Sequence, residues 1–372
     1  MVGPFPRTPM RIDGGVAAAT TYLSQALTQE PGIDLIGVRV VARASASASG
    51  NELGWPVVNL ELGRFSVSTF FRQQQWQFES LLRQYKPDLI HAQGADSSGY
   101  LAVSSGRPAV VTIHGILNEC AKLRTNPVRR LREYAQAWIT EQFVVERAKH
   151  IIAISPYVAS YYESRLRGAI HEIPNAISPA FFEVQRRPER GRLLFAGRIS
   201  KGKGVIDLVT AVAREPQAVS NVILAGTVPD RGFASQLRDA IDRTGQADRV
   251  KLAGLLDERM VLAEFARASA LVLPSYQETA PMVIQQAMAA GLPVVATRVG
   301  GVPAMIEQDV SGLLFEPGDV GELRRLLQRL QEDSHLGQRL AAAARARAEE
   351  HFTAERVAAA TRAAYERVLD AG

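Results

Sequence analysis

The sequence predicts an α/β protein with two doubly wound parallel-sheet domains that face a central cleft. Its 372 residues, 47% of them hydrophobic, exceed what one ordinary core accommodates. Short apolar runs alternate with amphipathic stretches, which is typical of strands and helices in parallel sheets. A polar, proline-containing stretch, EVQRRPERG at 183–191, separates two such series and is the predicted linker.

The first series begins with the short apolar segment MVGPFP. It looks like the end of a strand and a turn, so we expect either a short first strand or a start codon placed downstream of the true one. Gly14 and Gly15 form a turn before an alanine-rich helix. The other expected elements are the strand DLIGVRVVA, a helix within 66–85, the strands PDLIHAQG and RPAVVTIHG, a helix over 129–149, the strand HIIAIS, the helix SPYVASYYESRL and the short strand HEIPNAI.

The second series starts after the linker, which gives domains of residues 1–183 and 184–352. Its last portion, 320–372, is rich in Arg, Ala and Glu and is predicted to be helical. The elements before it are the strand RLLFA, the helix VIDLVTAVAR, the strand NVILAG, the helix FASQLRDAIDRTG, the strand VKLAGLL, the helix ERMVLAEFARAS, the strand ALVLPS, a helix in APMVIQQAMAAG and the strand VVAT.

The composition and net charge of the chain exclude some classes of function. The net charge is +5, which permits contact with anionic ligands or lipid headgroups. The arginines are spread along the chain rather than clustered with aromatic residues, which argues against nucleic-acid binding. The single cysteine, Cys120, excludes an internal disulfide and fits a reducing compartment, so we expect a cytoplasmic protein. The longest apolar runs are much shorter than a membrane span.

The stretch FAGRISKGKG at 195–204 combines a strand end with a glycine turn at Gly197. It places Arg198 and Lys203 at the carboxyl edge of the second sheet, where ligands bind in open α/β sheets. A guanidinium fork and an ammonium point charge both suit phosphate. Two solvated cations on a loop would give the same spacing, and both interpretations remain open.

Two features of the first half are further candidates. Gly14 and Gly15 precede a helix, so their backbone N–H groups can approach an anion, although a plain tight turn explains them equally simply. His114 follows a strand directly, on a loop that we expect to face the cleft. A lone histidine is often a structural residue, and its place at the carboxyl end of a strand is the argument for function.

The stretch QETAPMVIQQAMAAGLPVVAT at 277–297 places Glu278 just before a helix whose first turn carries Pro281. Free N–H groups and the dipole of that turn suit a phosphate, whereas the carboxylate would accept hydrogen bonds from sugar hydroxyls. The combination predicts a site for a nucleoside diphosphate attached to a sugar. No D-x-D pair occurs in the chain, so cations and helix dipoles would neutralise the charge without a metal.

These stretches resemble the family 4 glycosyltransferases. GRISKGKG, VILAG, VKLAGLL and ALVLPSYQETAPMVIQQAMAAGLPVVATRVGG are similar to the carboxyl half of that family, and DGGV, HAQG, TIHG, IIAIS and IPNAI to its amino half. The resemblance implies the GT-B fold, with two Rossmann-like domains and a last helix, 353–372, that packs back on the first. It implies metal-independent transfer of a sugar, of hexosyl type, from a nucleoside-diphosphate sugar with retention of configuration.

The resemblance also assigns roles. Arg198 and Lys203 would hold the donor diphosphate, Glu278 would contact the transferred sugar, and His114 would lie near that sugar. Gln286 falls where the family usually has a ribose-binding glutamate. The remaining donor contacts would come from Gly14, Gly15, Gly197 and the backbone near Leu256, which would meet the base.

Two departures from the family pattern affect the donor site. Gln286 is an amide, and its hydrogen bonds lack charge assistance, so they are roughly half as strong as those of a carboxylate. The usual glycine-rich segment is Thr279-Ala280-Pro281-Met282 here. Since proline has no N–H, we expect phosphate contacts to shift to Met282 and Val283, with Ala280 as a further donor-binding residue.

Several alternatives stay open. The donor base is uracil or guanine, and the acceptor is a glycan, lipid-linked or small-molecule hydroxyl in bacterial polysaccharide or glycoconjugate synthesis. A nucleotide-sugar epimerase or a non-catalytic binder would share much of the donor site. The segment CAKLRTNPVRRLRE carries five cations against one acid. It suggests peripheral contact through 122–132 with the inner face of the plasma membrane, or simply a solvated loop and helix start.

Overall fold

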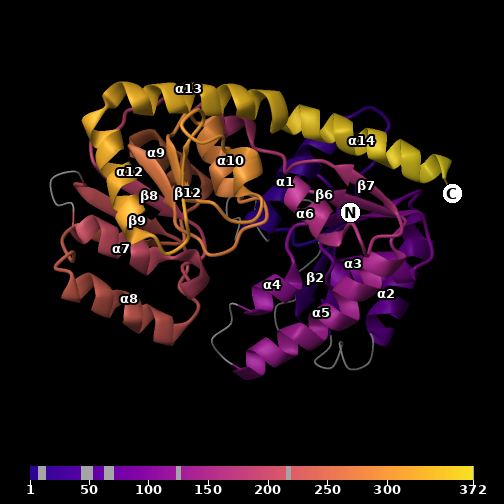
Figure 1. Cartoon of the computed structure of the whole chain (residues 1–372). Helices are drawn as coiled ribbons and strands as arrows, with labels where there is room; N and C mark the ends of the chain where they lie inside the picture. The colour runs from indigo at the N-terminus through magenta and orange to yellow at the C-terminus, as the bar shows by residue number, and fades with distance from the viewer. Residues whose placement is uncertain (7–13, 43–52, 63–70, 123–126, 215–218, 372) are drawn as a thin grey trace. The chain divides into compact units, whose positions relative to one another are not determined.

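The computed structural model describes residues 1–6, 14–42, 53–62, 71–122, 127–214 and 219–371 (Figure 1). Within these ranges the chain forms two compact units, one of residues 1–6, 16–176 and 354–371 and one of residues 14–15 and 177–353. The change of unit falls between Ala176 and Ile177, earlier than the expected boundary after residue 183. The last helix, α14 (Ala354–Asp370), belongs to the first unit.

The first unit contains a seven-stranded sheet in which every pair of neighbours is parallel. β1 pairs with both β2 and β4 although it has only two residues, so the short first strand lies inside the sheet. The strand order is β3 (Val57–Leu62), β2 (Gly37–Ala42), β1 (Val2–Gly3), β4 (Ile90–Gln93), β5 (Ala109–Ile113), β6 (His150–Ala153) and β7 (Ala169–Glu172).

Helices cover both faces of this sheet, as the right-handed crossovers of parallel strands require. On one face α3 packs against both α2 and α5, with α4 beside α5, whereas α14 lies against β5 on the other face together with α1 (Figure 1). The helices not yet given are α1 (Gly15–Leu27), α2 (Arg72–Tyr85), α3 (Ser97–Ser104), α4 (Leu117–Lys122), α5 (Pro127–Arg147) and α6 (Pro156–Tyr162).

The second unit contains a six-stranded parallel sheet. Its strands follow the order β10 (Val250–Gly254), β9 (Asn221–Ala225), β8 (Arg192–Ala196), β11 (Ala270–Leu273), β12 (Val294–Thr297) and β13 (Leu313–Phe315). The chain builds outward from β8 to β10 and then returns to the other side of β8 with β11. The point between β8 and β11 is therefore the topological switch point of this sheet.

Helices α7, α8 and α12 pack together in the second unit, and α10 packs against α13. Strands β11 and β12 are buried on both faces, which explains why they are the continuous apolar runs ALVL and VVAT, whereas the edge strand β10 is largely exposed. The helices are α7 (Val205–Ala213), α8 (Arg231–Arg243), α9 (Glu258–Arg267), α10 (Met282–Ala289), α11 (Val302–Met305), α12 (Val320–Glu332) and α13 (Ser334–His351), with short 3₁₀ turns η2 (Pro179–Phe181) and η3 (Lys201–Lys203).

Most expected elements are present, and the structure adds several that were not expected. Strand β3 and helix α3 were not expected from the sequence, although α3 begins where the Asp96 side chain accepts a hydrogen bond from the Ser98 N–H. Serine and glycine in SSGYLAVS lower the helix propensity, so this cap was the better signal. Also absent from the expectation were α4, α11 and β13. In the part of the chain that the structure describes, no helix combines the length and apolarity needed to cross a membrane.

Gly204 lets two loops of the second unit touch. It has φ of 62°, and a Cβ there would lie 1.9 Å from the carbonyl oxygen of Pro274. We expect Gly204→Ala to lower the free energy of unfolding by at least about 2 kcal/mol more than Gly245→Ala, because Gly245 shares the positive φ but has open space around it. Urea or thermal unfolding of the two variants measures the difference, and equal losses would contradict the contact.

Candidate active site

The carboxyl edge of the second sheet brings together the loops that follow β8 and β11. These strands flank the switch point, where neighbouring loops leave in opposite directions and open a crevice. The Tyr276 N–H donates to the Gly202 carbonyl oxygen at 2.9 Å, which joins the two loops through their backbones. The switch point therefore holds the cationic stretch of one loop against the acidic stretch of the other.

The loop after β8 is fixed by the neighbouring loop after β9. Gly197 donates to the Ala225 carbonyl at 2.9 Å and Ile199 to the Thr227 carbonyl at 2.9 Å, so the strand ladder continues into both loops. A Cβ at Gly226 would lie 1.8 Å from the Gly197 carbonyl oxygen, which leaves no room for a side chain. Arg198 is held on this ordered turn with its side chain exposed.

Lys203 ends the turn η3 and meets Glu278 from the other loop. Its Nζ donates to Glu278 Oε1 at 2.5 Å, and the Ser275 hydroxyl donates to the same oxygen at 2.7 Å. Glu278 is buried, and the side chain of Lys203 is 27% exposed. Removing a carboxylate from water is costly, and these two donors offset the cost. The structure thus joins two predicted site residues 75 positions apart.

The start of α10 lies directly after Glu278. Pro281 occupies the N-cap position and no side chain caps the helix, so the first-turn N–H groups belong to Met282 and Val283. Ala280 and Met282 are buried, whereas Val283 and Gln286 keep part of their surface exposed. This geometry agrees with an anion site at the helix N-terminus, and the contacts expected from Met282 and Val283 stay a prediction.

The remaining donor-side candidates lie at chain turns. Leu256 is half-buried in the loop after β10, immediately before Asp257, whose side chain caps α9 by accepting from the Met260 N–H. Gly14 has φ of 95°, and α1 begins at Gly15. The structure thus places Leu256 at the same sheet edge as Arg198, two strands away.

His114 belongs to a hydrogen-bonded polar network in the first unit. It follows β5, and its Nε2 lies 2.7 Å from Gln93 Oε1 on the neighbouring strand β4. Gln93 Nε2 lies 3.0 Å from His91 Nε2, which is also 2.7 Å from the Thr112 hydroxyl. His91 Nδ1 in turn lies 2.6 Å from the Tyr365 hydroxyl on α14.

The partners assign the tautomers of the two histidines. The amide N–H of Gln93 donates to His91 Nε2, so His91 carries its proton on Nδ1 and donates to Tyr365; His114 donates from Nε2 to the Gln93 oxygen. Burial lowers the pKa of His114 to about 4, while a hydrogen bond with Asn175 acts in the opposite direction. Burial also holds the pKa of His91 well below its usual range. Both rings are therefore neutral near pH 7.

Sequence reasoning missed the residues that hold the candidates in place. Ser275, which supports Glu278, had a weak signal as the last residue of ALVLPS. His91 and Gln93 stand in the quoted stretch HAQG, and their alternation along one strand could have placed them on one face beside His114. Tyr365 had no signal, because 274 residues separate it from His91.

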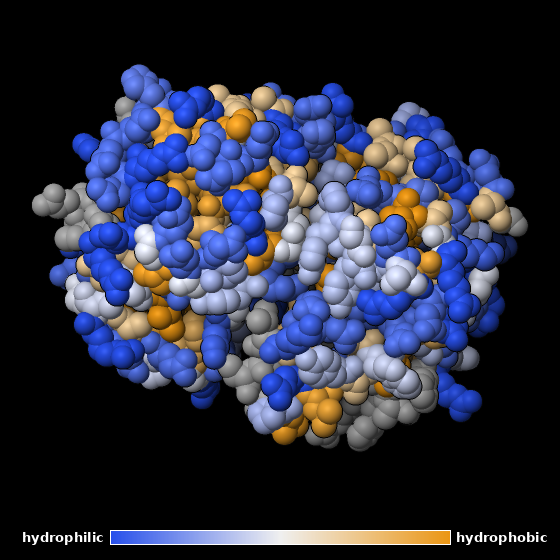
Figure 2. Space-filling view, in the orientation of Figure 1, coloured by the Kyte–Doolittle hydropathy of each residue, from blue (hydrophilic) through white to orange (hydrophobic). Residues whose placement is uncertain are grey.

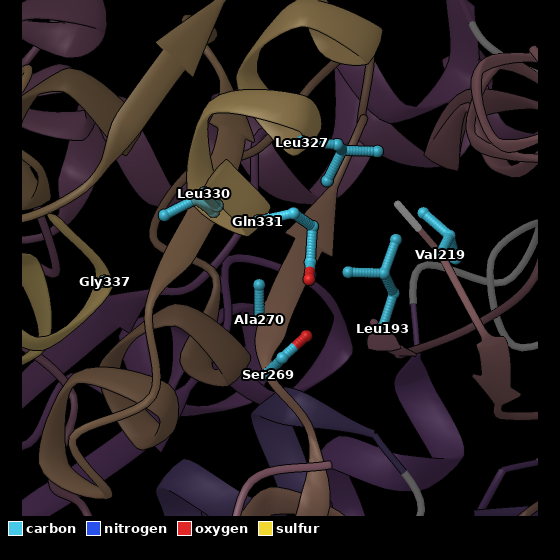
Figure 3. Close-up of a pocket in the computed structure, with 8 residues that line it drawn as sticks. All are labelled: Leu193, Val219, Ser269, Ala270, Leu327, Leu330, Gln331 and Gly337. Carbon is cyan, nitrogen blue, oxygen red and sulfur yellow. The ribbon is translucent and has the colours of Figure 1, made fainter. Parts of the chain in front are cut away.

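The cavity in Figure 3 is not part of this site. Leu193, Ser269 and Ala270 line it at the amino ends of β8 and β11, and Leu327 covers it from α12. Its volume is about 30 Å³, whereas ligand pockets measure roughly 300–1,000 Å³. The candidate site lies at the opposite, carboxyl ends of the same strands.

Two family models match the chain almost end to end. "Glycosyltransferase Family 4" matches residues 13–181, and "Glycosyl transferases group 1" matches residues 178–347. Glycogen synthase of Mycobacterium tuberculosis is 28% identical over 346 residues, which are 88% of this chain and 80% of the relative. The chain belongs to the family 4 glycosyltransferases, as its motifs predicted.

Solved structures confirm the GT-B fold. Sucrose-phosphate synthase from Thermosynechococcus elongatus superposes with a TM-score of 0.84 at 21% identity, covering 100% of this chain and 99% of that one. Anabaena HepE in complex with UDP-glucose gives a TM-score of 0.76 at 20% identity and covers 100% of both chains. The predicted pair of Rossmann-like parallel-sheet units is therefore confirmed.

The lowered pKa of His114 predicts a pH-dependent contribution to stability. The unfolded chain binds the proton near pH 6.5 and the folded chain only near pH 4, so the contribution is complete above pH 6.5 and is lost as the pH falls toward 4. We expect wild type to lose about 1 kcal/mol more unfolding free energy than His114→Asn between pH 7 and pH 5, given the partial exposure of the ring. Thermal unfolding at both pH values measures this.

The matched control for this titration is His335→Asn, which removes an exposed histidine. It should leave the pH dependence of wild type unchanged. The assignment of His114 as a neutral group in the folded chain is wrong if His114→Asn and wild type lose stability in parallel.

Proposed function

We propose that this glycosyltransferase moves a hexosyl group from a nucleoside-diphosphate sugar to an acceptor hydroxyl, with retention of configuration and without a metal ion. The observation that carries the proposal is the convergence of Arg198, Lys203 and Glu278 at the switch point beside the uncapped start of α10. This arrangement offers cations and N–H groups for a diphosphate and a carboxylate for hydroxyl groups.

The charges suit a diphosphate leaving group. Among the residues that the structure describes, Arg198 forms no ion pair and is exposed, so its guanidinium is available to phosphate oxygens. Lys203 shares its charge with Glu278 and is held in place by that pair. Met282 and Val283 add backbone donors, and Gly14, Gly15 and Gly197 allow close approach of the chain. Negative charge that develops on the departing diphosphate would be stabilised by groups already in position.

The sugar and the nucleoside of the donor would be held by hydrogen bonds rather than by ion pairs. Glu278 would accept hydrogen bonds from hydroxyls of the transferred sugar, and Gln286 from the ribose. The backbone near Leu256 would meet the base. His114, neutral near pH 7, would exchange a hydrogen bond with a sugar hydroxyl rather than contribute a cation.

The transfer step would follow a front-face course. The bond between the anomeric carbon and the phosphate oxygen breaks, and the acceptor oxygen forms its bond on the same face. The acceptor proton moves to the departing phosphate oxygen. Within this scheme Lys203 and Arg198 stabilise the charge of the leaving group, and no protein nucleophile is required.

The relatives favour particular donors. HepE was solved in complex with UDP-glucose. We therefore place UDP-glucose first among the candidates and GDP-linked sugars second. The acceptor would be a hydroxyl of a glycan, a lipid-linked sugar or a small molecule of bacterial glycoconjugate synthesis, in the cytoplasm.

The first prediction for this function concerns Lys203. We expect Lys203→Ala and Glu278→Ala each to reduce sugar transfer or donor hydrolysis at least about 100-fold, because each removes a group placed at the reacting centre. Lys201→Ala is the matched control, since Lys201 lies in the same turn η3 and is exposed. Thermal-shift screening of UDP, GDP, ADP and their sugars selects the donor, and release of the nucleotide measures the reaction.

Three results would overturn the proposal. Wild-type activity in either variant would show that the site is elsewhere. Conversion of the donor to an epimerised nucleotide sugar would identify an epimerase. Tight nucleotide binding without turnover across a panel of acceptors would identify a non-catalytic binder, which the amide at Gln286 favours.

The second prediction concerns Gln286. We expect Gln286→Glu to tighten donor binding about fivefold, because an ionised carboxylate accepts stronger hydrogen bonds from ribose hydroxyls than an amide does. Gln236→Glu adds the same charge at an exposed position of α8 and should change nothing. Calorimetric titration with the selected nucleotide measures both. Weaker binding by Gln286→Glu would contradict the proposed ribose contact. It would show that the surroundings of residue 286 require the amide of glutamine.

A further inference from the structure

Helix α5 of the first unit carries apolar side chains on two sides, whereas a surface helix usually carries them only on the side that packs against the protein. One side is packed into the unit, as its turns bury Ala137, Thr140, Glu141, Val144 and Val145. A surface helix normally carries polar residues on the side opposite its buried stripe. In the first half of α5 that opposite side is apolar as well.

The outer side of α5 exposes three large apolar side chains. Val128 is 76% exposed, Leu131 71% and Trp138 68%. Their spacings of three and seven residues, with exposed Ala135 between them, place them along one side of the helix. We call Val128, Leu131 and Trp138 the apolar stripe. Figure 2 shows hydrophobic residues at the lower edge of the molecule, where Figure 1 places the start of α5.

Cations accompany this stripe. Arg130 and Arg132 lie on the same two turns and are exposed, whereas the single acid of these turns, Glu133, is half-buried. Lys122, at the end of α4, is paired with Glu119 at 2.6 Å and adds little free charge. Of the segment 122–132 suggested by the sequence, residues 123–126 lie outside the described residues. The charge next to the apolar stripe is therefore positive and carried by arginine.

We propose that the apolar stripe and the two arginines dock α5 on the surface of an anionic lipid bilayer. Tryptophan and leucine on a helix with arginine neighbours are the groups that settle at the boundary between headgroups and acyl chains. Basic residues add attraction to anionic headgroups. A stable dimer needs about 20–30 residues on each side, far more than this stripe supplies, whereas a charged bilayer binds small stripes of this kind.

This docking is independent of the proposed sugar transfer, and it predicts a specific pattern of vesicle binding. The full-length protein should co-sediment with vesicles of equal parts phosphatidylcholine and phosphatidylglycerol, and not with pure phosphatidylcholine. Leu131→Ser/Trp138→Ser should weaken that binding at least about tenfold. Arg130→Gln/Arg132→Gln should weaken it too, and high salt should weaken the wild type similarly.

The matched control is Trp76→Ser on α2, because Trp76 is 69% exposed but stands apart from the stripe. It should bind vesicles as the wild type does, and all variants should keep the wild-type melting temperature. The proposal is overturned if wild type binds no anionic vesicles, or if the stripe variants bind like wild type. It is also overturned if they turn a dimer of the wild type into a monomer in size-exclusion chromatography, which would make the stripe an interface between copies.

Discussion

The ion pair between Lys203 and Glu278 joins the two loops that diverge from the switch point of the second sheet. Parallel strands bring those loops to one edge, but nothing in the sheet itself holds them together. Lys203 and Ser275 both donate to one oxygen of a carboxylate that is buried. Because a buried carboxylate without partners is strongly unfavourable, the loops must stay in this arrangement for the charge to be compensated.

Close backbone contacts at two glycines allow the loops to take up this arrangement. The loop after β8 touches the loop after β11 at Gly204 and the loop after β9 at Gly226, and at both glycines a Cβ would overlap a carbonyl oxygen. Side chains are thereby excluded from the two points where these loops touch, so Arg198, Lys203 and Glu278 are carried by loops whose backbones are in direct contact. A side chain added at either glycine would therefore shift these loops and the charged groups that they carry.

Structural features that depend on neighbouring residues in the chain could be predicted from the sequence. Long amphipathic helices and apolar strands follow from periodicity, and Arg198, Lys203 and Glu278 follow from positions next to strand ends. Helix α3 was missed because its serines and glycine lower the helix propensity, whereas β3 was missed although its sequence VVNLEL suits a strand. The pairing of Lys203 with Glu278 and of His91 with Tyr365 could not be derived, since each joins residues that only the folded chain brings together.

In the two units, the free-energy cost of burying polar side chains near the sheet edge is offset in different ways. In the second unit, charge is kept and compensated by an opposite charge, with Arg198 left exposed. In the first unit, burial keeps His91 and His114 uncharged, so that hydrogen bonds alone satisfy them through Gln93, Thr112 and Tyr365. A diphosphate requires the first kind of edge, whereas hydroxyl groups need only the second. The second unit thus keeps a compensated charge next to the exposed Arg198, whereas the first unit presents neutral hydrogen-bonding groups.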